Sequence, residues 1–200
     1  MRIVLASQSP SRAAILRGAG VEPVLRPAHV DERAIEAELA DAAPGDVVAA
    51  LAAAKAEAIA PHYPDDVVIG GDSMLLLDGQ LQGKPHTEER TVERWRAQAG
   101  KSAQLLTGHC ILLGDKRYVE TSTTTVHFAQ ASETDIAAYA ASGEPLQCAG
   151  AFTLEALGGW FIDAIEGDPS SVIGLSLPVV RRALYEFGVN ASEFWNLPRN

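Results

Sequence analysis

Short apolar runs alternate with longer amphipathic stretches along most of the chain. The short runs predict strands at residues 3–6, 23–25 and 67–69, and the first and third of these are expected to be buried. The longer stretches predict helices at residues 10–18, 31–39, 44–60, 88–99, 133–142 and 177–187. Ser9, Thr87 and Ser132 are suited to cap three of these helices, because their hydroxyls can accept from free backbone N–H groups.

Hairpin signals occur among these elements. The strand at residues 67–69 is expected to end at the GGD run of residues 70–72, and a second strand at residues 74–77 to enter a tight DG turn. Further strands are predicted at residues 102–113, 117–128 and 159–165. Because helices and strands alternate while hairpins also occur, we predict an α/β fold with a mixed sheet. The 200 residues fit a single domain, with residues 190–200 as a C-terminal tail.

The chain is acidic, with 16 Lys and Arg against 26 Asp and Glu and a net charge of -10. It lacks the overall basic charge of proteins that bind DNA or RNA, so no nucleic-acid polymer is expected as a partner. We find no leader sequence and no apolar run of about 18 residues, which predicts a cytoplasmic protein with no membrane partner. Any phosphate chemistry must therefore use a few local cations.

The two cysteines, Cys110 and Cys148, are too few for a disulfide framework and form no CxxC motif. His109 lies beside Cys110 without the spacing of metal ligands, which favours a buried strand over a zinc site. The three tryptophans are dispersed, so we interpret them as packing residues rather than as a stacking platform.

The segment SQSPSR at residues 7–12 is the first candidate for chemistry. It follows a predicted strand and opens a helix, where free N–H groups and the helix dipole favour anions. Ser7 and Ser9 can donate hydroxyl groups, and Arg12 can pair with an anion at that position. The alternative is an ordinary capped helix with a solvated arginine.

Asp72 is the second candidate, because a carboxylate at the end of a buried strand can hold Mg²⁺ or orient a water. Two lysines accompany it: Lys55 interrupts an Ala-rich helix, and Lys84 lies in the run GKP of a loop that is too short for a Walker A motif. Glu32 follows Asp31 at a helix start. The alternatives are a turn aspartate, two surface lysines and a carboxylate that only complements the helix dipole.

Taken together, these segments resemble the Maf family in order and spacing. The resemblance runs from about residue 3 to residue 185 and rests on LASQSPSR (5–12), VDE (30–32), AKA (54–56), GDS (71–73), GKP (83–85), GEPL (143–146), CAGA (148–151) and EGDPSSVIGL (166–175). Maf proteins are nucleoside triphosphate pyrophosphatases with an elongated, two-lobed α/β fold of the inosine-triphosphate-pyrophosphatase type and a central cleft. The resemblance therefore implies a hydrolase of nucleotide anhydride bonds that is one Maf-like domain over residues 1–200.

The resemblance also implies roles for single residues. It implies that the substrate-binding residues of the phosphate tail are Ser7, Ser9, Arg12, Lys55 and Lys84. Asp72 corresponds to the catalytic base, and Glu32 with Asp72 to the ligands of a divalent cation, Mg²⁺ or Mn²⁺. The reaction would convert a nucleoside triphosphate and water into the monophosphate and pyrophosphate. A homodimer is a further expectation from the family.

Three positions resemble the family's specificity positions: Ser11, Ser73 and Glu155. At the third position, Glu155 resembles the glutamate found in the branch of the family that acts on 7-methyl-GTP. A carboxylate can accept from the N1–H and N2–H₂ edge of guanine. We therefore expect a guanine-type base among modified or non-standard nucleotides. The alternatives are a dTTP/UTP pyrophosphatase, or a nucleotide-sensing regulator of cell division without significant turnover.

Overall fold

The structure of the protein is a computed structural model that describes residues 1–196. Its α-helices are α1 (Pro10–Gly18), α2 (Glu32–Glu38), α3 (Pro44–Ile59), α4 (Glu88–Gln98), α5 (Glu133–Ala141), α6 (Pro169–Ile173) and α7 (Leu177–Glu186). Its strands are β1 (Ile3–Leu5), β2 (Val24–Leu25), β3 (Val67–Leu77), β4 (Gln80–Gln82), β5 (Ser102–Leu113), β6 (Lys116–Phe128) and β7 (Ile162–Glu166). Short 3₁₀ helices add η1 (Ala60–His62), η2 (Glu144–Gln147), η3 (Ala149–Ala151), η4 (Leu157–Phe161) and η5 (Ala191–Phe194).

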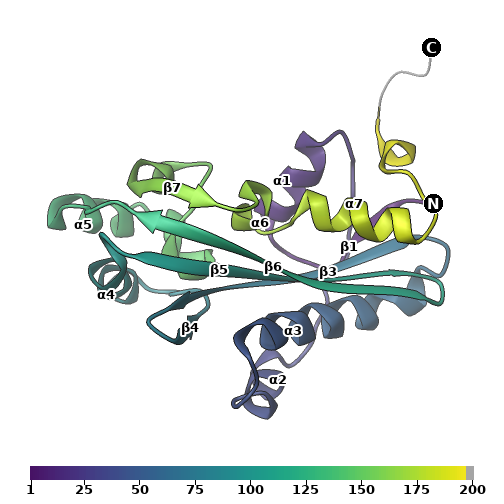
Figure 1. Cartoon of the computed structure of the whole chain (residues 1–200), viewed down its shortest axis with the longest axis horizontal. Coiled ribbons are helices and arrows are strands. Elements are labelled where there is room, and N and C mark those ends of the chain that lie inside the picture. Colours follow the sequence, from purple (N-terminus) through teal and green to yellow (C-terminus); the bar gives the residue numbers. More distant parts are fainter. Residues whose placement is uncertain (197–200) are drawn as a thin grey trace. The chain divides into compact units, whose positions relative to one another are not determined.

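The strands of the described residues form one seven-stranded sheet with the order β2-β1-β3-β5-β6-β7, and β4 pairs with β3 (Figure 1). Strand β1 runs parallel to β2 and β3, whereas the pairs β3–β4 and β6–β7 are antiparallel. The predicted α/β fold with a mixed sheet is confirmed. The chain divides into two compact units, a first unit (Met1–Asp72, Thr107–Ser122, Gly174–Asn200) and a second unit (Ser73–Leu106, Thr123–Ile173).

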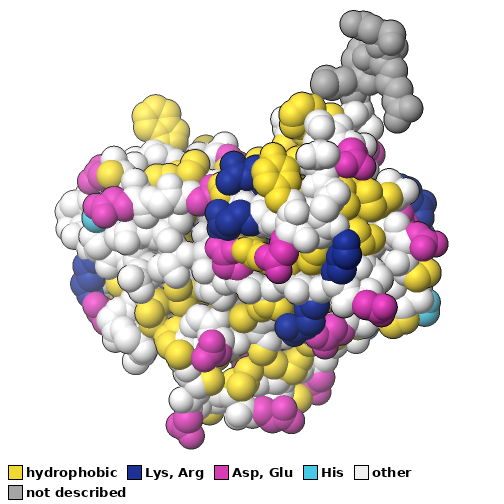
Figure 2. Space-filling view, turned by 45° about the vertical axis from the view of Figure 1, so that its right-hand side comes forward, with side chains coloured by type: hydrophobic (Ala, Val, Ile, Leu, Met, Phe, Trp, Pro, Cys, Tyr) yellow, Lys and Arg dark blue, Asp and Glu magenta, His cyan; other side chains and the backbone are white. Residues whose placement is uncertain are grey.

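The surface carries charges of both signs. Figure 2 shows acidic and basic side chains interspersed with apolar ones on the face that it displays. Within residues 1–196, no helix has the length and apolar character that crossing a bilayer requires.

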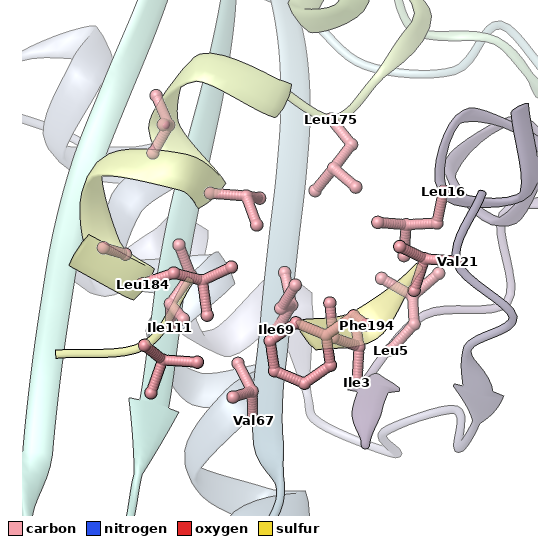
Figure 3. Close-up of a cluster of buried hydrophobic side chains, with 14 of the residues drawn as sticks. Ile3, Leu5, Leu16, Val21, Val67, Ile69, Ile111, Leu175, Leu184 and Phe194 are labelled. Atoms are coloured by element: carbon pink, nitrogen blue, oxygen red, sulfur yellow. The ribbon is translucent and has the colours of Figure 1, made fainter. Parts of the chain in front are cut away.

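The core of the first unit follows from the alternation of side chains along its strands. Ile3 and Leu5 of β1, with Val67 and Ile69 of β3, point to the face that α1 and α7 cover (Figures 1 and 3). Leu16 of α1 packs against them in the same cluster. Val4 and Val68 point to the opposite face, where Ala52 and Ala56 of α3 cover them. Both faces of these strands are therefore buried, which explains their continuous apolar runs.

The core of the second unit is aromatic. Trp95 of α4 is fully buried and makes edge-to-face contacts with Phe128, Tyr139 and Phe161, with ring centroids 5.5–5.6 Å apart. Its indole Nε1 donates to the carbonyl of Ala151 at 2.7 Å, so its polar atom is satisfied inside the core. The burial of Trp95 agrees with its interpretation as a packing residue.

The predicted helix caps are confirmed. Ser9, Thr87 and Ser132 each accept a hydrogen bond from the backbone N–H three residues ahead, at the starts of α1, α4 and α5. Cys110 is buried in β5, as predicted. The caps depend only on neighbouring residues, which is why the sequence was sufficient for them.

The predicted end of the strand at residues 70–72 is wrong. Strand β3 continues from Val67 to Leu77, so Asp72 lies inside the strand instead of at its carboxyl end. Gly70 and Gly71 resemble a turn signal in the sequence, but both keep an extended backbone. The predicted turn at Asp78 and Gly79 does follow β3 and leads into β4.

Three smaller expectations also differ from the structure. Residues 159–161 belong to η4, and strand β7 begins only at Ile162. Trp160 and Trp195 are 83% and 48% exposed, so they are not core residues. Of the expected tail at 190–200, Phe194 in η5 is buried in the core of the first unit, and residues 197–200 lie outside the described residues.

Candidate active site

The carboxyl end of β1 forms an open edge beside β3. Leu5, the last residue of β1, pairs with Ile69, so β3 continues past the end of its neighbour. Strands β2 and β3 lie on opposite sides of β1 and both run parallel to it. Open α/β sheets bind ligands at such a point, where the strand order reverses. The segment after β1 and residues 70–72 of β3 both lie at this edge.

The segment after β1 is organised by Arg12. Its Nε donates to the carbonyl of Gly174 at 2.8 Å, and its Nη1 donates to Ser7 Oγ at 3.0 Å. Ser7 is buried, and its Oγ also accepts from the N–H of Ser9 at 3.2 Å. Because Ser7 Oγ accepts from both, its own hydroxyl hydrogen can point to an anion at the start of α1.

Two glycines also lie close to the Arg12 side chain, where a larger residue would crowd it. A Cβ at Gly71 would lie 3.3 Å from Arg12 Nε, and one at Gly174 would lie 3.4 Å from Arg12 Cγ. Burial lowers the pKa of Arg12, while the charges of Asp72 and Glu32 raise it. The guanidinium therefore has a fixed orientation beside the acidic residues of the site.

Lys55 of α3 joins two carboxylates. Its Nζ lies 2.7 Å from Asp72 Oδ1 and 3.0 Å from Glu32 Oε1. Lys55 and Asp72 are each only 8% exposed, whereas the Glu32 side chain is about half exposed. A buried lysine is costly unless it is paired, so the two carboxylates explain how Lys55 can lie in an apolar helix.

The close approach of α3 to β3 makes this pairing possible. A Cβ at Gly70 would lie 2.1 Å from the carbonyl oxygen of Ala52 and 2.7 Å from the amide nitrogen of Ala56. Gly70 and Asp72 share one face of β3, because side chains alternate along a strand. The glycine lets the helix backbone approach, and two residues later Asp72 reaches Lys55.

Glu36 is a further acidic residue at this site that the sequence analysis did not single out. It lies one helical turn after Glu32 on α2. Burial raises the pKa of Glu36, and the charges of Asp72 and Glu32 raise it further against the opposite effect of Lys55. The spacing of four residues from Glu32 was the available signal, since residues i and i+4 share a helix face.

The proposed metal ligands fit a cation that arrives with its substrate. Among residues 1–196, no group of three His, Cys, Asp or Glu side chains is arranged to hold a metal by itself. Lys55 takes one oxygen of Glu32 and one of Asp72, so each carboxylate keeps a second oxygen. Magnesium is commonly bound by one or two carboxylates together with substrate phosphates, which suits this arrangement.

The second unit carries the remaining candidates, Lys84, Ser73 and Glu155, and Ser11 lies on α1 in the first unit. Lys84 is exposed in the loop after β4. The peptide before it is fixed, because the carbonyl of Gly83 accepts from the Arg94 guanidinium and from the N–H of Gly150. The sequence gives no signal for Arg94, since its contact with Gly83 depends on how α4 packs.

Glu155 is exposed in the turn between Phe152 and η4. Its Oε2 accepts from the N–H of Leu154 at 3.1 Å. The structure thus places the ten predicted side chains in two groups. Ser7, Ser9, Ser11, Arg12, Glu32, Lys55 and Asp72 belong to the first unit, and Ser73, Lys84 and Glu155 to the second.

Comparison with known protein families identifies the family of this chain. The model of Maf-like proteins matches residues 2–187. The chain belongs to the Maf family. The residues of both groups lie inside the matched region, and so do all the strands of the described sheet.

Curated Maf relatives match over nearly the whole chain. A protein of Corynebacterium aurimucosum is 78% identical over 98% of this chain and 98% of its own length. A protein of Corynebacterium efficiens is 77% identical over 98% and 99%, and one of Nocardia farcinica is 55% identical over 98% and 97%. All three are named nucleoside triphosphate pyrophosphatase. Among solved structures, the Staphylococcus aureus Ham1 protein is similar with a TM-score of 0.44 and 18% identity, over 66% of this chain and 73% of that one.

Proposed function

We propose that this Maf protein is a nucleoside triphosphate pyrophosphatase, a hydrolase that releases pyrophosphate and leaves the monophosphate. The observation that carries the proposal is the cluster of Lys55, Asp72 and Glu32 beside Arg12, at the carboxyl end of β1. A segment suited to an anion and a buried carboxylate beside a lysine provide two of the parts that phosphoryl-transfer sites use, electrostatic stabilisation and a base that positions water. The names of the relatives support the same reaction.

The phosphate tail is the part of the substrate that the first unit recognises. Arg12, together with Ser7 and Ser9 at the start of α1, supplies a fixed cation and hydroxyl donors for phosphate oxygens. We place Lys84 on the same tail, as the cation of the second unit. Because the chain has a net charge of -10, these local cations have to offset the acidic surroundings.

Asp72 is the residue that we assign to the chemical step. Lys55 holds its Oδ1, so its Oδ2 has to serve both the cation and the reaction: one of its two lone pairs would face the cation, and the other can accept the proton of the water that attacks the α-phosphorus. Lys55 keeps this carboxylate in one orientation and adds positive charge near the transition state. Bound with the substrate to Glu32 and Asp72, Mg²⁺ or Mn²⁺ would offset the negative charge that develops on the phosphate oxygens.

We further propose a guanine-type base, such as 7-methylguanine, with Glu155 accepting from its N1–H and N2–H₂ groups. Ser11 and Ser73 are the other two proposed specificity residues. Selectivity for dTTP or UTP is the alternative within the same reaction. A nucleotide sensor without turnover is the alternative of another class, and the buried Lys55–Asp72 pair argues against it because binding alone needs no base.

A pyrophosphate-release assay over a panel of nucleotides tests the proposal. We expect turnover with Mg²⁺ for 7-methyl-GTP and GTP above that for UTP and dTTP. Binding without release of pyrophosphate for every nucleotide would favour the sensor. The predicted homodimer is tested in the same preparation by light scattering.

A further inference from the structure

Glu144 at the start of η2 is bonded more extensively than a surface glutamate needs to be. Its Oε1 accepts from Thr153 Oγ1 at 2.5 Å, from the N–H of Gly158 at 3.0 Å and from the Tyr139 hydroxyl at 3.1 Å. Its Oε2 accepts from the N–H of Leu157 at 3.2 Å. One carboxylate thus binds both ends of residues 153–158, which we call the Glu155 turn.

Two neighbours of Glu144 complete this attachment. The Tyr139 hydroxyl donates to Glu144 and accepts from the N–H of Thr153 at 3.1 Å, so the ring joins the aromatic core to the turn. Gly158 has no room for a side chain, since a Cβ would lie 2.4 Å from the Thr153 carbonyl oxygen and 2.5 Å from the Tyr139 hydroxyl. The turn is therefore closed tightly around the carboxylate.

The charge of Glu144 suits this arrangement. Burial raises its pKa, but the hydrogen bonds from Thr153, Gly158, Leu157 and Tyr139 outweigh burial, and the pKa lies below its ordinary value. All four groups donate, so only an acceptor without a hydrogen can satisfy them together. An amide at this position would face at least one of these donors with its own N–H₂ group.

Glu155 has no comparable support of its own. It is exposed, and the contact of its carboxylate is with the adjacent N–H of Leu154. The position of its side chain therefore depends on the backbone of the turn, which Glu144 fixes on both sides of it.

We propose that Glu144 is a positioning residue for base recognition, which acts by holding the Glu155 turn in the conformation that presents Glu155 to the base. The inference rests on the proposed function of Glu155. It gives a role to the GEPL segment of the family resemblance, for which the proposed reaction has no other use. In this role Glu144 acts through the turn and not by contact with the substrate.

Kinetics of Glu144→Gln, Thr153→Val and Tyr139→Phe test this role, with Glu155→Gln as reference. The control is Glu133→Gln, the same change at an exposed carboxylate of the second unit that pairs with Arg96. We expect the KM for GTP to rise about tenfold in Glu144→Gln with little change in kcat, and the GTP/UTP ratio of kcat/KM to fall toward that of Glu155→Gln. The Ki of inorganic tripolyphosphate, which has no base, should stay within twofold, because the phosphate site is untouched.

Hydrogen exchange provides a readout that does not depend on turnover. At least one of the amides of Leu157 and Gly158 should exchange faster in Glu144→Gln than in the wild type and in Glu133→Gln, because the N–H₂ group of the glutamine replaces one of the two oxygens that accept from them. Unchanged exchange at these two amides would overturn the positioning role. Faster exchange with an unchanged GTP/UTP ratio in Glu144→Gln, while Glu155→Gln changes that ratio, would overturn the link between turn and base.

Failure of the proposed function has a different signature. A wild type without turnover, or a silent Glu155→Gln, would overturn the base assignment and this inference with it, whatever the exchange rates. An equal rise of KM for GTP and of Ki for tripolyphosphate in Glu144→Gln would show a general structural role instead.

Discussion

Lys55 determines much of the behaviour of the site at the scale of single residues. It is a buried cation held between Asp72 and Glu32, so its two partners act on stability as well as on chemistry. The sequence drew attention to Lys55 because charge is unusual in an Ala-rich helix. The pairing itself depends on how α3 packs on β3, and that information is spread over residues far apart in the chain.

Substitution of Asp72 separates its two roles. In Asp72→Asn the side chain keeps its shape and can still accept from Lys55, but it can neither take a proton nor hold a cation. We expect kcat to fall by about 10²–10⁴-fold, the usual effect of losing a general base. Because Asp72 lies inside β3 and pairs with a buried lysine, we also expect a loss of stability of about 1–3 kcal/mol.

Steady-state kinetics and thermal unfolding of Asp72→Asn measure these two effects. Glu57→Gln is the control, since it removes a charge from an exposed carboxylate of α3 that pairs with Arg117 and has no assigned role in the site. Retention of more than a third of the wild-type kcat in Asp72→Asn would contradict the assignment of the base.

At the scale of helices and strands, the local structure depends on glycines that allow another part of the chain to approach closely. The helices and their caps could be predicted from sequence, because Ser9, Thr87 and Ser132 act on their own neighbours. The continuation of β3 could not, because Gly70 and Gly71 have the composition of a turn. The two glycines leave space for α3 on one face of the strand and for Arg12 on the other. This depends on tertiary packing and could not be predicted from the sequence.

Substitution of these two glycines should therefore have different effects. A Cβ at Gly70 meets the backbone of α3 at 2.1 Å, and backbone cannot yield easily, so Gly70→Ala should lower the free energy of unfolding by about 1–3 kcal/mol or more. A Cβ at Gly71 meets only the Arg12 side chain at 3.3 Å. We expect Gly71→Ala to keep most of its stability and to raise the KM for nucleotides.

Chemical denaturation and kinetics of Gly70→Ala and Gly71→Ala check this contrast. Equal losses of stability in both variants would show that Arg12 is as rigid as the backbone of α3.

The start of β3 is tied to the chain terminus by a pair whose effect depends on pH. Asp66 accepts from the guanidinium and the N–H of Arg2, and these bonds lower the pKa of Asp66 below its ordinary value. The folded protein then keeps the carboxylate charged at pH values where the unfolded chain is protonated. The pair therefore adds stability above about pH 3.9, and this stability is lost as the pH falls through the lowered pKa.

Thermal unfolding of the wild type and of Asp66→Asn between pH 7 and pH 3 measures this contribution. We expect the wild type to have the higher Tm at pH 7 and the difference to shrink as the pH falls. A difference that is constant over this range would show that the charge of Asp66 is unimportant.

At the scale of the whole molecule, the net charge opposes the binding of a triphosphate. The chain has a net charge of -10, and a triphosphate adds about four negative charges, so the overall field repels the proposed substrate. The composition already implied that local cations are needed. It could not show that Arg12 and Lys55 belong to one compact unit and Lys84 to the other, because both units are assembled from separate segments of the chain.

Dependence on a divalent metal follows from this balance of charge. In residues 1–196 no three potential ligands form a metal site by themselves, so the cation has to be shared with the phosphates. We expect activity to be lost in EDTA and restored by Mg²⁺ or Mn²⁺, while the Tm of the protein without nucleotide stays the same with and without EDTA.

The local cations are tested by Lys84→Ala. Its KM should rise about 10–100-fold, because a charge-assisted contact is lost, and its Tm should not change, since Lys84 is exposed. Lys101→Ala, which removes an exposed lysine paired with Asp78 in the same unit, serves as the control and should match the wild type. Full activity in EDTA would exclude the cation from the reaction, and a silent Lys84→Ala would make that residue an ordinary surface lysine.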